Sequence, residues 1–165
     1  SLVTGIHDKA FMTEMGVVTK LNYSALHWDD AAGATLCEAL RYAHAHGGLK
    51  KLKTLSLEKN KLGDGFVKSL VTLLDEGGLA GVEARSLSRN AISEQGMQEL
   101  AAVIARGRLP SCTEIVLWGN PGSAAPVEEA AKQRTGSRPA ARPGGAAGRR
   151  EGRPGARAGS GGARR

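Results

Sequence analysis

Apolar residues recur along this chain at a fixed interval, together with an asparagine that keeps its place in the pattern. In the middle of each segment apolar and polar positions alternate, which predicts a short β-strand. One such unit cannot bury its apolar side alone, so we expect a structural repeat whose units stack. Three segments align without gaps: Leu49-x-x-Leu52-x-x-Leu55-x-Leu57-x-x-Asn60-x-Leu62, Leu79-x-x-Val82-x-x-Arg85-x-Leu87-x-x-Asn90-x-Ile92 and Leu109-x-x-Cys112-x-x-Ile115-x-Leu117-x-x-Asn120-x-Gly122.

A second apolar pattern, with residues three and four apart, follows the strand segments and is typical of an amphipathic helix. Glycines at 77, 78 and 107 lie where these helices are expected to end. A further short helix is predicted over residues 125–134, with a proline in its first turn. The two apolar stripes are separated by the same interval as the strand segments: Val67, Leu70, Leu73 and Leu74, then Met97, Leu100, Val103 and Ile104.

The N-terminal part of the pattern is less regular. Here the interval is four positions longer, and it aligns Leu21, Tyr23 and Trp28 with Leu55, Leu57 and Leu62 of the next segment. We expect the four extra residues to form a loop within residues 42–51, because a loop can absorb an insertion without disturbing the stack.

The segments resemble the leucine-rich repeat pattern L-x-x-L-x-L-x-x-N-x-L, and their length is similar to that of the ribonuclease-inhibitor-like subfamily. That subfamily includes ribonuclease inhibitors, the sensor arrays of NOD-like receptors and the activating protein of the Ran GTPase. The resemblance covers residues 15–134 and implies an α/β fold: a right-handed solenoid with parallel strands on its concave side and helices on its convex side. Three residues depart from the pattern, namely Leu26 in place of Asn, Arg85 in place of a core Leu, and Gly122 in place of an apolar residue.

The sequence divides into a lead-in (1–14), an array of three to four units (15–134) and a basic tail (135–165). From residue 136 onward the chain has eight Arg and one Glu among Gly, Ala, Pro and Ser, so this tail accounts for the whole net charge of +7. Without aromatic or large aliphatic residues it is expected to be disordered. Either it attracts nucleic-acid phosphates weakly and without sequence preference, or it is a solvated linker or extension.

Composition limits the location and the cofactors of the protein. Leu, Val and Ala must fill the core, because aromatic residues make up only 4% of the chain. Two cysteines, Cys37 and Cys112, fit neither a disulfide framework nor a zinc site, which favours a reducing, cytoplasmic location. No apolar run approaches the roughly 18 residues of a membrane span, so no membrane partner is expected. Because the chain begins at Ser1 and the array lacks obvious caps, we expect a piece of a longer array.

No catalytic motif stands out, and we expect neither enzymatic activity nor a cofactor. The pair His44-x-His46 has no nearby Cys or second His pair at ligand spacing, and it lies where a helix should end. The segment Gly63-Asp64-Gly65 is in phase with residues 93–96, so a turn of the repeat explains it better than a calcium or phosphate loop.

The candidate working surface is the strand face that points away from the helices, because side chains alternate across a strand. Most of its positions are small and polar, whereas Val116 and Trp118 are apolar and are expected to face solvent. Such a pair is typical of an anchor for a protein partner. The alternative is that both residues contact a further unit, the tail or the last helix. The predicted stripe consists of Lys20, Asn22, Ser24, Thr54, Ser56, Glu58, Ala84, Ser86, Ser88, Glu114, Val116 and Trp118.

These patterns together predict a protein-binding module with a preformed surface. Its charged residues are expected to set orientation and association rate more than affinity. Two other functions stay open: regulation of a GTPase, which stimulated GTP hydrolysis would reveal, and salt-sensitive binding of nucleic acid through the tail. The predicted partner-binding residues are Ser56, Glu58, Ser86, Ser88, Arg89, Glu114, Val116 and Trp118.

Overall fold

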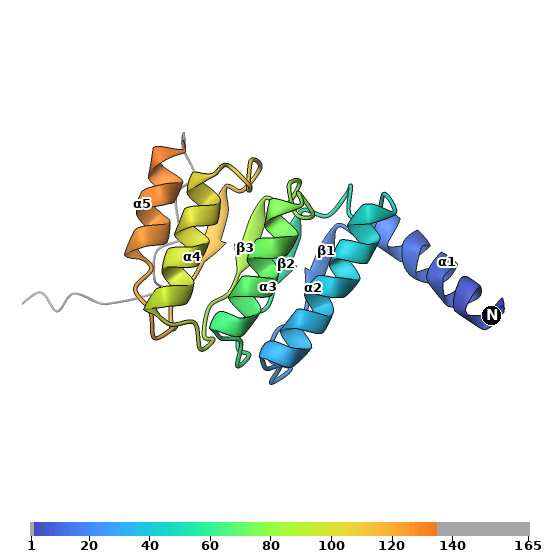
Figure 1. Ribbon diagram of the computed structural model, residues 1–165, viewed down its shortest axis with the longest axis horizontal. Coiled ribbons are helices and arrows are strands. Elements are labelled where there is room, and N and C mark those ends of the chain that lie inside the picture. The colour runs from blue at the N-terminus through green and yellow to red at the C-terminus, as the bar shows by residue number, and fades with distance from the viewer. Residues whose placement is uncertain (1, 135–165) are drawn as a thin grey trace, which may run out of the picture.

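The computed structural model of this chain describes residues 2–134, and the tail predicted for residues 135–165 lies outside them. Within this range the fold is α/β, as predicted, with strands and helices that alternate along the chain (Figure 1). The elements are α1 (Leu2–Val17), β1 (Lys20–Asn22), α2 (Asp30–Ala45), β2 (Thr54–Ser56), α3 (Asp64–Asp75), β3 (Ala84–Ser86), α4 (Glu94–Ala105), β4 (Glu114–Val116) and α5 (Ala125–Gln133).

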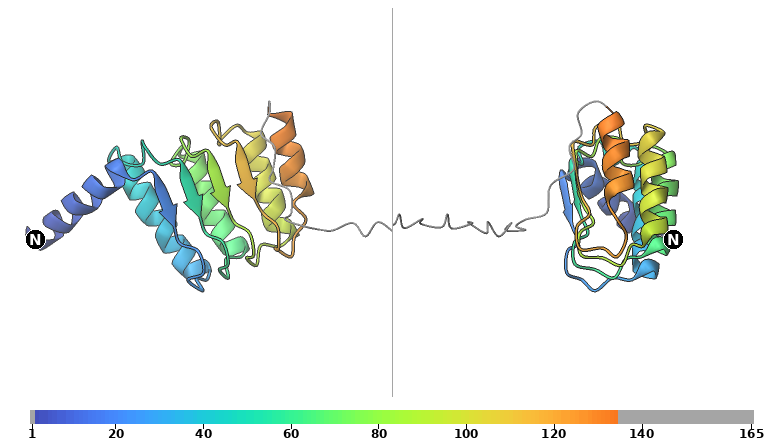
Figure 2. Two further views of the ribbon diagram at one scale, coloured as in Figure 1. Left: turned by 180° about the vertical axis from the view of Figure 1, so that it is seen from behind. Right: turned by 90° about the vertical axis from the view of Figure 1, so that its left-hand side faces the viewer.

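The four strands form one parallel sheet in chain order. Leu21 pairs with Leu55, Leu55 with Arg85, and Arg85 with Ile115, so the register confirms both the regular interval and the longer first one. Helices α2 to α5 all lie on one side of the sheet, and we call the other side the open sheet face (Figure 2). Each strand with its following helix is one unit, from unit 1 (β1 and α2) to unit 4 (β4 and α5).

Buried apolar side chains fill the layer between the sheet and the helices. The positions that recur in the sequence are the ones that are buried, because each lies on the helix side of a strand or on the sheet side of a helix. Burying a side chain of this size contributes about 1.5–3 kcal/mol. In unit 2 the buried positions are Leu52, Leu55, Leu57, Leu62, Phe66, Val67, Leu70, Leu73 and Leu74.

Helix α2 is longer than the helices that follow it, which corrects one prediction. It has 16 residues, whereas α3 and α4 have 12 each. The four extra residues of unit 1 therefore lengthen α2 by about one turn and do not form a loop. Residues 30–45 contain no proline and no late glycine, so the helix continues without a break through Tyr42.

The last turns of α1 and an aromatic pair lie at the N-terminal end of the core. Helix α1 runs across the predicted boundary between residues 14 and 15, and its partly buried Phe11, Met12 and Met15 pack against the core. In unit 1, Tyr23 and Trp28 replace two leucines and stack with ring centroids 5.0 Å apart. Larger rings thus fill the space that Leu57 and Leu62 fill in unit 2.

The recurring asparagines connect neighbouring units through side-chain hydrogen bonds to the backbone. The side-chain carbonyl of Asn90 accepts a hydrogen bond from the Leu62 amide (3.1 Å), and its amide donates to the carbonyls of Leu57 (2.9 Å) and Leu87 (3.1 Å). One buried carboxamide therefore satisfies backbone groups in its own unit and in the preceding one. Asn60 bonds in the same way to the turn of unit 1, whose own position holds the exposed Leu26.

A second set of contacts, which the sequence analysis did not predict, reaches the other way along the chain. An acidic residue begins each of α2, α3 and α4 and accepts hydrogen bonds from the unit that follows. Asp30 accepts from the amides of residues 63 and 65, Asp64 from the amide and hydroxyl of Ser93, and Glu94 from the Ser123 amide. These carboxylates lie at the helix N-termini, where the helix dipole favours negative charge. The equivalent residue in unit 4 is Ala124, which ends the series.

Arg85 occupies a core position, and the structure buries it to 3% exposure. Its guanidinium donates to the carbonyls of Leu79 (2.6 Å) and Val82 (3.1 Å), while Nε has no hydrogen-bond partner. Burial therefore lowers the pKa of Arg85. A cation held by neutral partners in a core is costly, so this position weakens unit 3.

Gly122 also departs from the pattern, and the structure gives the reason. A Cβ atom at this position would overlap the backbone of Ser93, so only glycine fits. The amides of Lys61 and Ala91 donate hydrogen bonds to carbonyls of the preceding unit. The equivalent residue of unit 4 is Pro121, which has no amide hydrogen. The Gly122 amide donates to the Ile92 carbonyl (2.9 Å) in its stead. The chain is thereby drawn toward unit 3, with glycine where unit 2 has the buried Leu62.

We expect Asn90→Ala to destabilise the protein by about 2–3 kcal/mol, because buried backbone groups of two units lose their partner. Urea unfolding monitored by circular dichroism measures this. Asn22→Ala is the matched control, since Asn22 is exposed and bonds only to Ser24 in its own turn. Equal unfolding midpoints for the two variants would contradict the structural role of Asn90.

Asp64→Asn is expected to cost about 1 kcal/mol at pH 7, because a neutral amide replaces the capping carboxylate. The hydrogen bond from Ser93 holds the pKa of Asp64 below its ordinary value of 3.8. Ionised Asp64 therefore stabilises the protein fully at pH values above its ordinary pKa. This stabilisation is lost as the pH falls through the lowered pKa of the folded state. The melting temperature of the Asp64→Asn variant should therefore approach that of the wild type as the pH is lowered from 7 to 2. The exposed Glu38, replaced by Gln, is the control, and a pH-independent difference would argue against this account.

Arg85→Leu is expected to stabilise the protein by about 1–2 kcal/mol, because an aliphatic side chain replaces a buried charge. The equivalent positions of the adjoining strands hold the aliphatic residues Leu55 and Ile115. Chemical denaturation with a constant m-value measures the change. Arg85→Met controls for the loss of charge without branching. An unchanged or lower stability of both variants would show that the bonds to Leu79 and Val82 outweigh the burial cost.

Candidate functional site

The open sheet face gathers most of the predicted partner-binding residues. Ser56, Ser86 and Val116 form one row across β2, β3 and β4, and all three are half-buried. Glu114 is exposed at the start of β4. Three more of the predicted partner-binding residues lie just after the ends of β2, β3 and β4: Glu58, Arg89 and Trp118.

Ser88 was predicted to face solvent, and this is wrong. Its side chain is 1% exposed, and its hydroxyl lies 3.2 Å from that of Ser86. Glu58 and Trp118 also lie two residues beyond their strands and are only half-buried, so the end of the strand does not by itself bury Ser88. Its equivalents in the neighbouring units are the larger Glu58 and Trp118, and a serine between two larger side chains is readily shielded. Ser88 therefore belongs to the structure of the turn and not to the surface.

Small hydroxyl groups cover the centre of the open sheet face. The hydroxyl of Ser24 lies 2.8 Å from that of Ser56 and also donates to Asn22 (2.7 Å). A shallow hollow of about 200 Å³ runs across the strands at this place. Its outward-facing residues are Lys20, Asn22, Thr54, Ser56, Ala84, Ser86, Glu114 and Val116. Side chains this short leave the backbone surface within reach of a partner.

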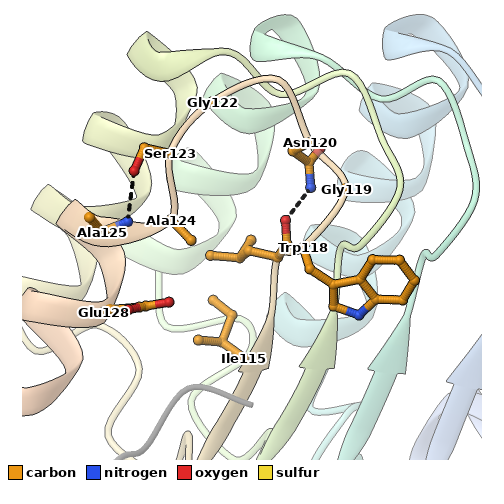
Figure 3. Close-up of a pocket in the computed structure, with 10 residues that line it drawn as sticks. Ile115, Trp118, Gly119, Asn120, Gly122, Ser123, Ala124, Ala125 and Glu128 are labelled. Carbon is orange, nitrogen blue, oxygen red and sulfur yellow. Dashed lines mark hydrogen bonds between the residues drawn. The ribbon is translucent and has the colours of Figure 1, made fainter. Parts of the chain in front are cut away.

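Trp118 and Arg89 form a stacked pair beside this hydroxyl-covered area. The guanidinium carbon of Arg89 lies 4.3 Å from the centre of the indole ring, a cation–π contact. The Arg89 amide also donates to the Trp118 carbonyl (2.9 Å). Figure 3 shows the indole turned over the neighbouring strands and away from α5, so this ring does not contact the last helix. The sequence suggested both residues as candidates but did not pair them, because they belong to different units.

The turn after each strand needs a residue in the left-handed region, and this position differs from unit to unit. Gly119 occupies it in unit 4 with a φ of 79°, whereas Lys59 (58°) and Arg89 (54°) occupy it in units 2 and 3 and Ala25 (59°) in unit 1. A residue with a side chain costs about 1 kcal/mol there relative to glycine. Units 2 and 3 thus place basic side chains where glycine fits best.

The two basic side chains differ in their surroundings. Lys59 pairs with Glu58 at 3.7 Å. Arg89 forms no ion pair with a carboxylate of residues 10–134, and its guanidinium is held by the indole alone. The indole therefore holds the exposed Arg89 cation in place on the open sheet face, and no carboxylate of residues 10–134 neutralises it.

A second concavity lies between β4 and α5, and it has a volume of about 320 Å³. Figure 3 shows Ile115 and Glu128 pointing into it. It exists because Gly122 stands where Leu62 and Ile92 fill the core of the preceding units. This hollow marks the end of the apolar layer in unit 4 and lies on the helix side of β4.

Other candidate groups in the described part of the chain have structural partners. His44 bonds to the Glu76 carbonyl (3.2 Å) and His46 to the Tyr42 carbonyl (2.8 Å). Burial raises the pKa of the Cys37 thiol to about 12, which keeps this sulfur protonated and unreactive near neutral pH. Residues 10–134 bring together no three His, Cys, Asp or Glu side chains that could hold a metal ion.

Comparisons with models of known protein families and with curated proteins find no match to this chain. Over residues 2–134, no helix combines the length and the apolar character that crossing a bilayer requires. Function therefore has to be inferred from the surface itself.

Proposed function

We propose that this chain is a leucine-rich repeat protein of the ribonuclease-inhibitor-like kind, and that it binds a protein partner in the cytoplasm. In this proposal the units form a right-handed solenoid, and the open sheet face is its concave side. Support comes from the parallel strands in chain order, from their register, and from asparagines that hold successive turns in the same way.

The observation that carries the binding proposal is the composition of the open sheet face. Trp118, with Val116 beside it, supplies an apolar surface among short hydroxyl side chains. Tryptophan is among the residues that contribute most to protein interfaces, whereas serine contributes little. A partner would therefore gain most of its affinity at Trp118 and its fit along Ser56 and Ser86.

Preformed geometry makes such a surface effective. Short strands held by backbone hydrogen bonds lose little conformational entropy when a partner binds, so moderate contacts translate into affinity. Glu58 and Glu114 flank the apolar residues, and their charges would orient an approaching partner more than they would hold it.

The test is affinity capture from cell lysate with the full chain, in a buffer whose salt concentration suppresses binding through the basic tail. Val116→Ala with Trp118→Ala should lower partner recovery at least about tenfold, since losing a central Trp commonly costs about 2 kcal/mol or more. Lys68→Ala with Thr72→Ala, two residues on the outer side of α3, is the matched control and should retain the partner.

Thermal melts of both double variants confirm that each is folded before capture. Equal losses in the two variants, or a partner retained by the Val116 and Trp118 variant, would count against the open sheet face as the binding surface. Captured material that consists of nucleic acid and disappears with salt would favour the tail as the functional segment.

A further inference from the structure

We propose that Arg89, stacked on Trp118, is a carboxylate-recognition site, and that the partner of the open sheet face presents an acidic segment to it. The inference rests on the proposed function and adds the chemistry of the partner. A glutamate or aspartate of that segment would bind the guanidinium, and an adjoining apolar side chain would lie against the indole and Val116.

The first argument is the way in which the guanidinium is held. Its central carbon lies 4.3 Å from the centre of the Trp118 ring, while a backbone hydrogen bond of 2.9 Å fixes the same two residues to each other. Stacking uses the face of the guanidinium and leaves the N–H groups along its edge available. Those N–H groups match the two oxygens of a carboxylate, and the stacking restrains them before a partner arrives.

The second argument is charge. Several other basic side chains of the described units have acidic neighbours: Lys59 lies near Glu58, Lys53 near Glu83, and Arg106 near Asp75. No carboxylate of residues 10–134 pairs with Arg89, although this residue is exposed on the candidate binding surface. An acidic partner would complete here an interaction that the chain makes internally elsewhere.

A carboxylate suits this place better than a phosphate group. Phosphorylated segments are recognised by clusters of arginine, because the group carries close to two charges at neutral pH. Arg89 lies over the indole of Trp118, and the basic residue at the equivalent position of unit 2, Lys59, is paired with Glu58. One cation next to an apolar surface fits a singly charged side chain that is followed by an apolar one.

The left-handed turn provides a sharp test. Arg89 and Lys59 occupy equivalent positions with nearly equal φ values of 54° and 58°, so Arg89→Gly and Lys59→Gly relieve the same backbone strain. Only Arg89→Gly removes the stacked guanidinium. Any difference in binding between the two variants therefore reports the side chain and not the turn.

The experiment selects binders from a phage-displayed library of random dodecapeptides against the full-length wild type, Arg89→Gly, Lys59→Gly and the Val116→Ala, Trp118→Ala variant. Wild type and Lys59→Gly should enrich peptides in which Asp or Glu adjoins an apolar residue. Arg89→Gly should lose this acidic preference and bind the selected peptides at least about tenfold more weakly in fluorescence anisotropy. Arg89→Lys, which keeps the charge without the planar stack, should lie between them.

The outcomes separate this inference from the proposed function. Peptides that depend on Trp118 but show no acidic preference, or that bind equally to Arg89→Gly, overturn the carboxylate site and leave the binding surface in place. Peptides that ignore the Val116 and Trp118 substitutions overturn the proposed surface itself. A synthetic peptide that binds more tightly with phosphoserine in place of its glutamate would show that the site recognises phosphate, which also overturns the proposal.

Discussion

The asparagine carboxamide of the turns, buried at Asn60 and Asn90 and half-buried at Asn120, makes the hydrogen bonds on which the stacking of these units depends. In three successive turns it accepts one or two amide hydrogens from the preceding unit and donates to carbonyls of both units. A turn inside a stack has backbone groups that water cannot reach, and each would cost free energy if it were left unpaired. The asparagines remove that cost, so leucines above and below them can pack without a solvated gap.

The strands and helices were predictable because their apolar residues face a single buried layer with a fixed period. Leu55 and Ile115 pair across the sheet with Arg85 between them, as the regular interval requires. The length of α2 was not predictable from that interval, since four residues fit equally well into a loop or into one more helical turn. A period determines which residues are equivalent but does not determine how an insertion is accommodated.

The candidate site was predictable in its face but not in its contacts. Alternation placed Ser56, Ser86 and Val116 on the open sheet face correctly, because that rule follows from strand geometry. It failed at Ser88, whose short side chain lies between the larger Glu58 and Trp118 of the neighbouring units. The stacking of Arg89 on Trp118 depends on which side chains of adjacent units meet, and the contacts of the acids at 30, 64 and 94 depend on where each helix begins. These are properties of the assembled stack and not of a single segment.

The contacts between units have a direction, and this limits which unit can stand where. Asparagines reach back toward the N-terminus, while Asp30, Asp64 and Glu94 reach forward, so a middle unit is held from both of its sides. Unit 1 has Leu26 for its asparagine, and unit 4 has Ala124 for its acid, so each outer unit lacks the side chain that would point away from the stack. Units that look alike in sequence are therefore not interchangeable: exchanging the first with the last would turn unpaired groups inward at both junctions.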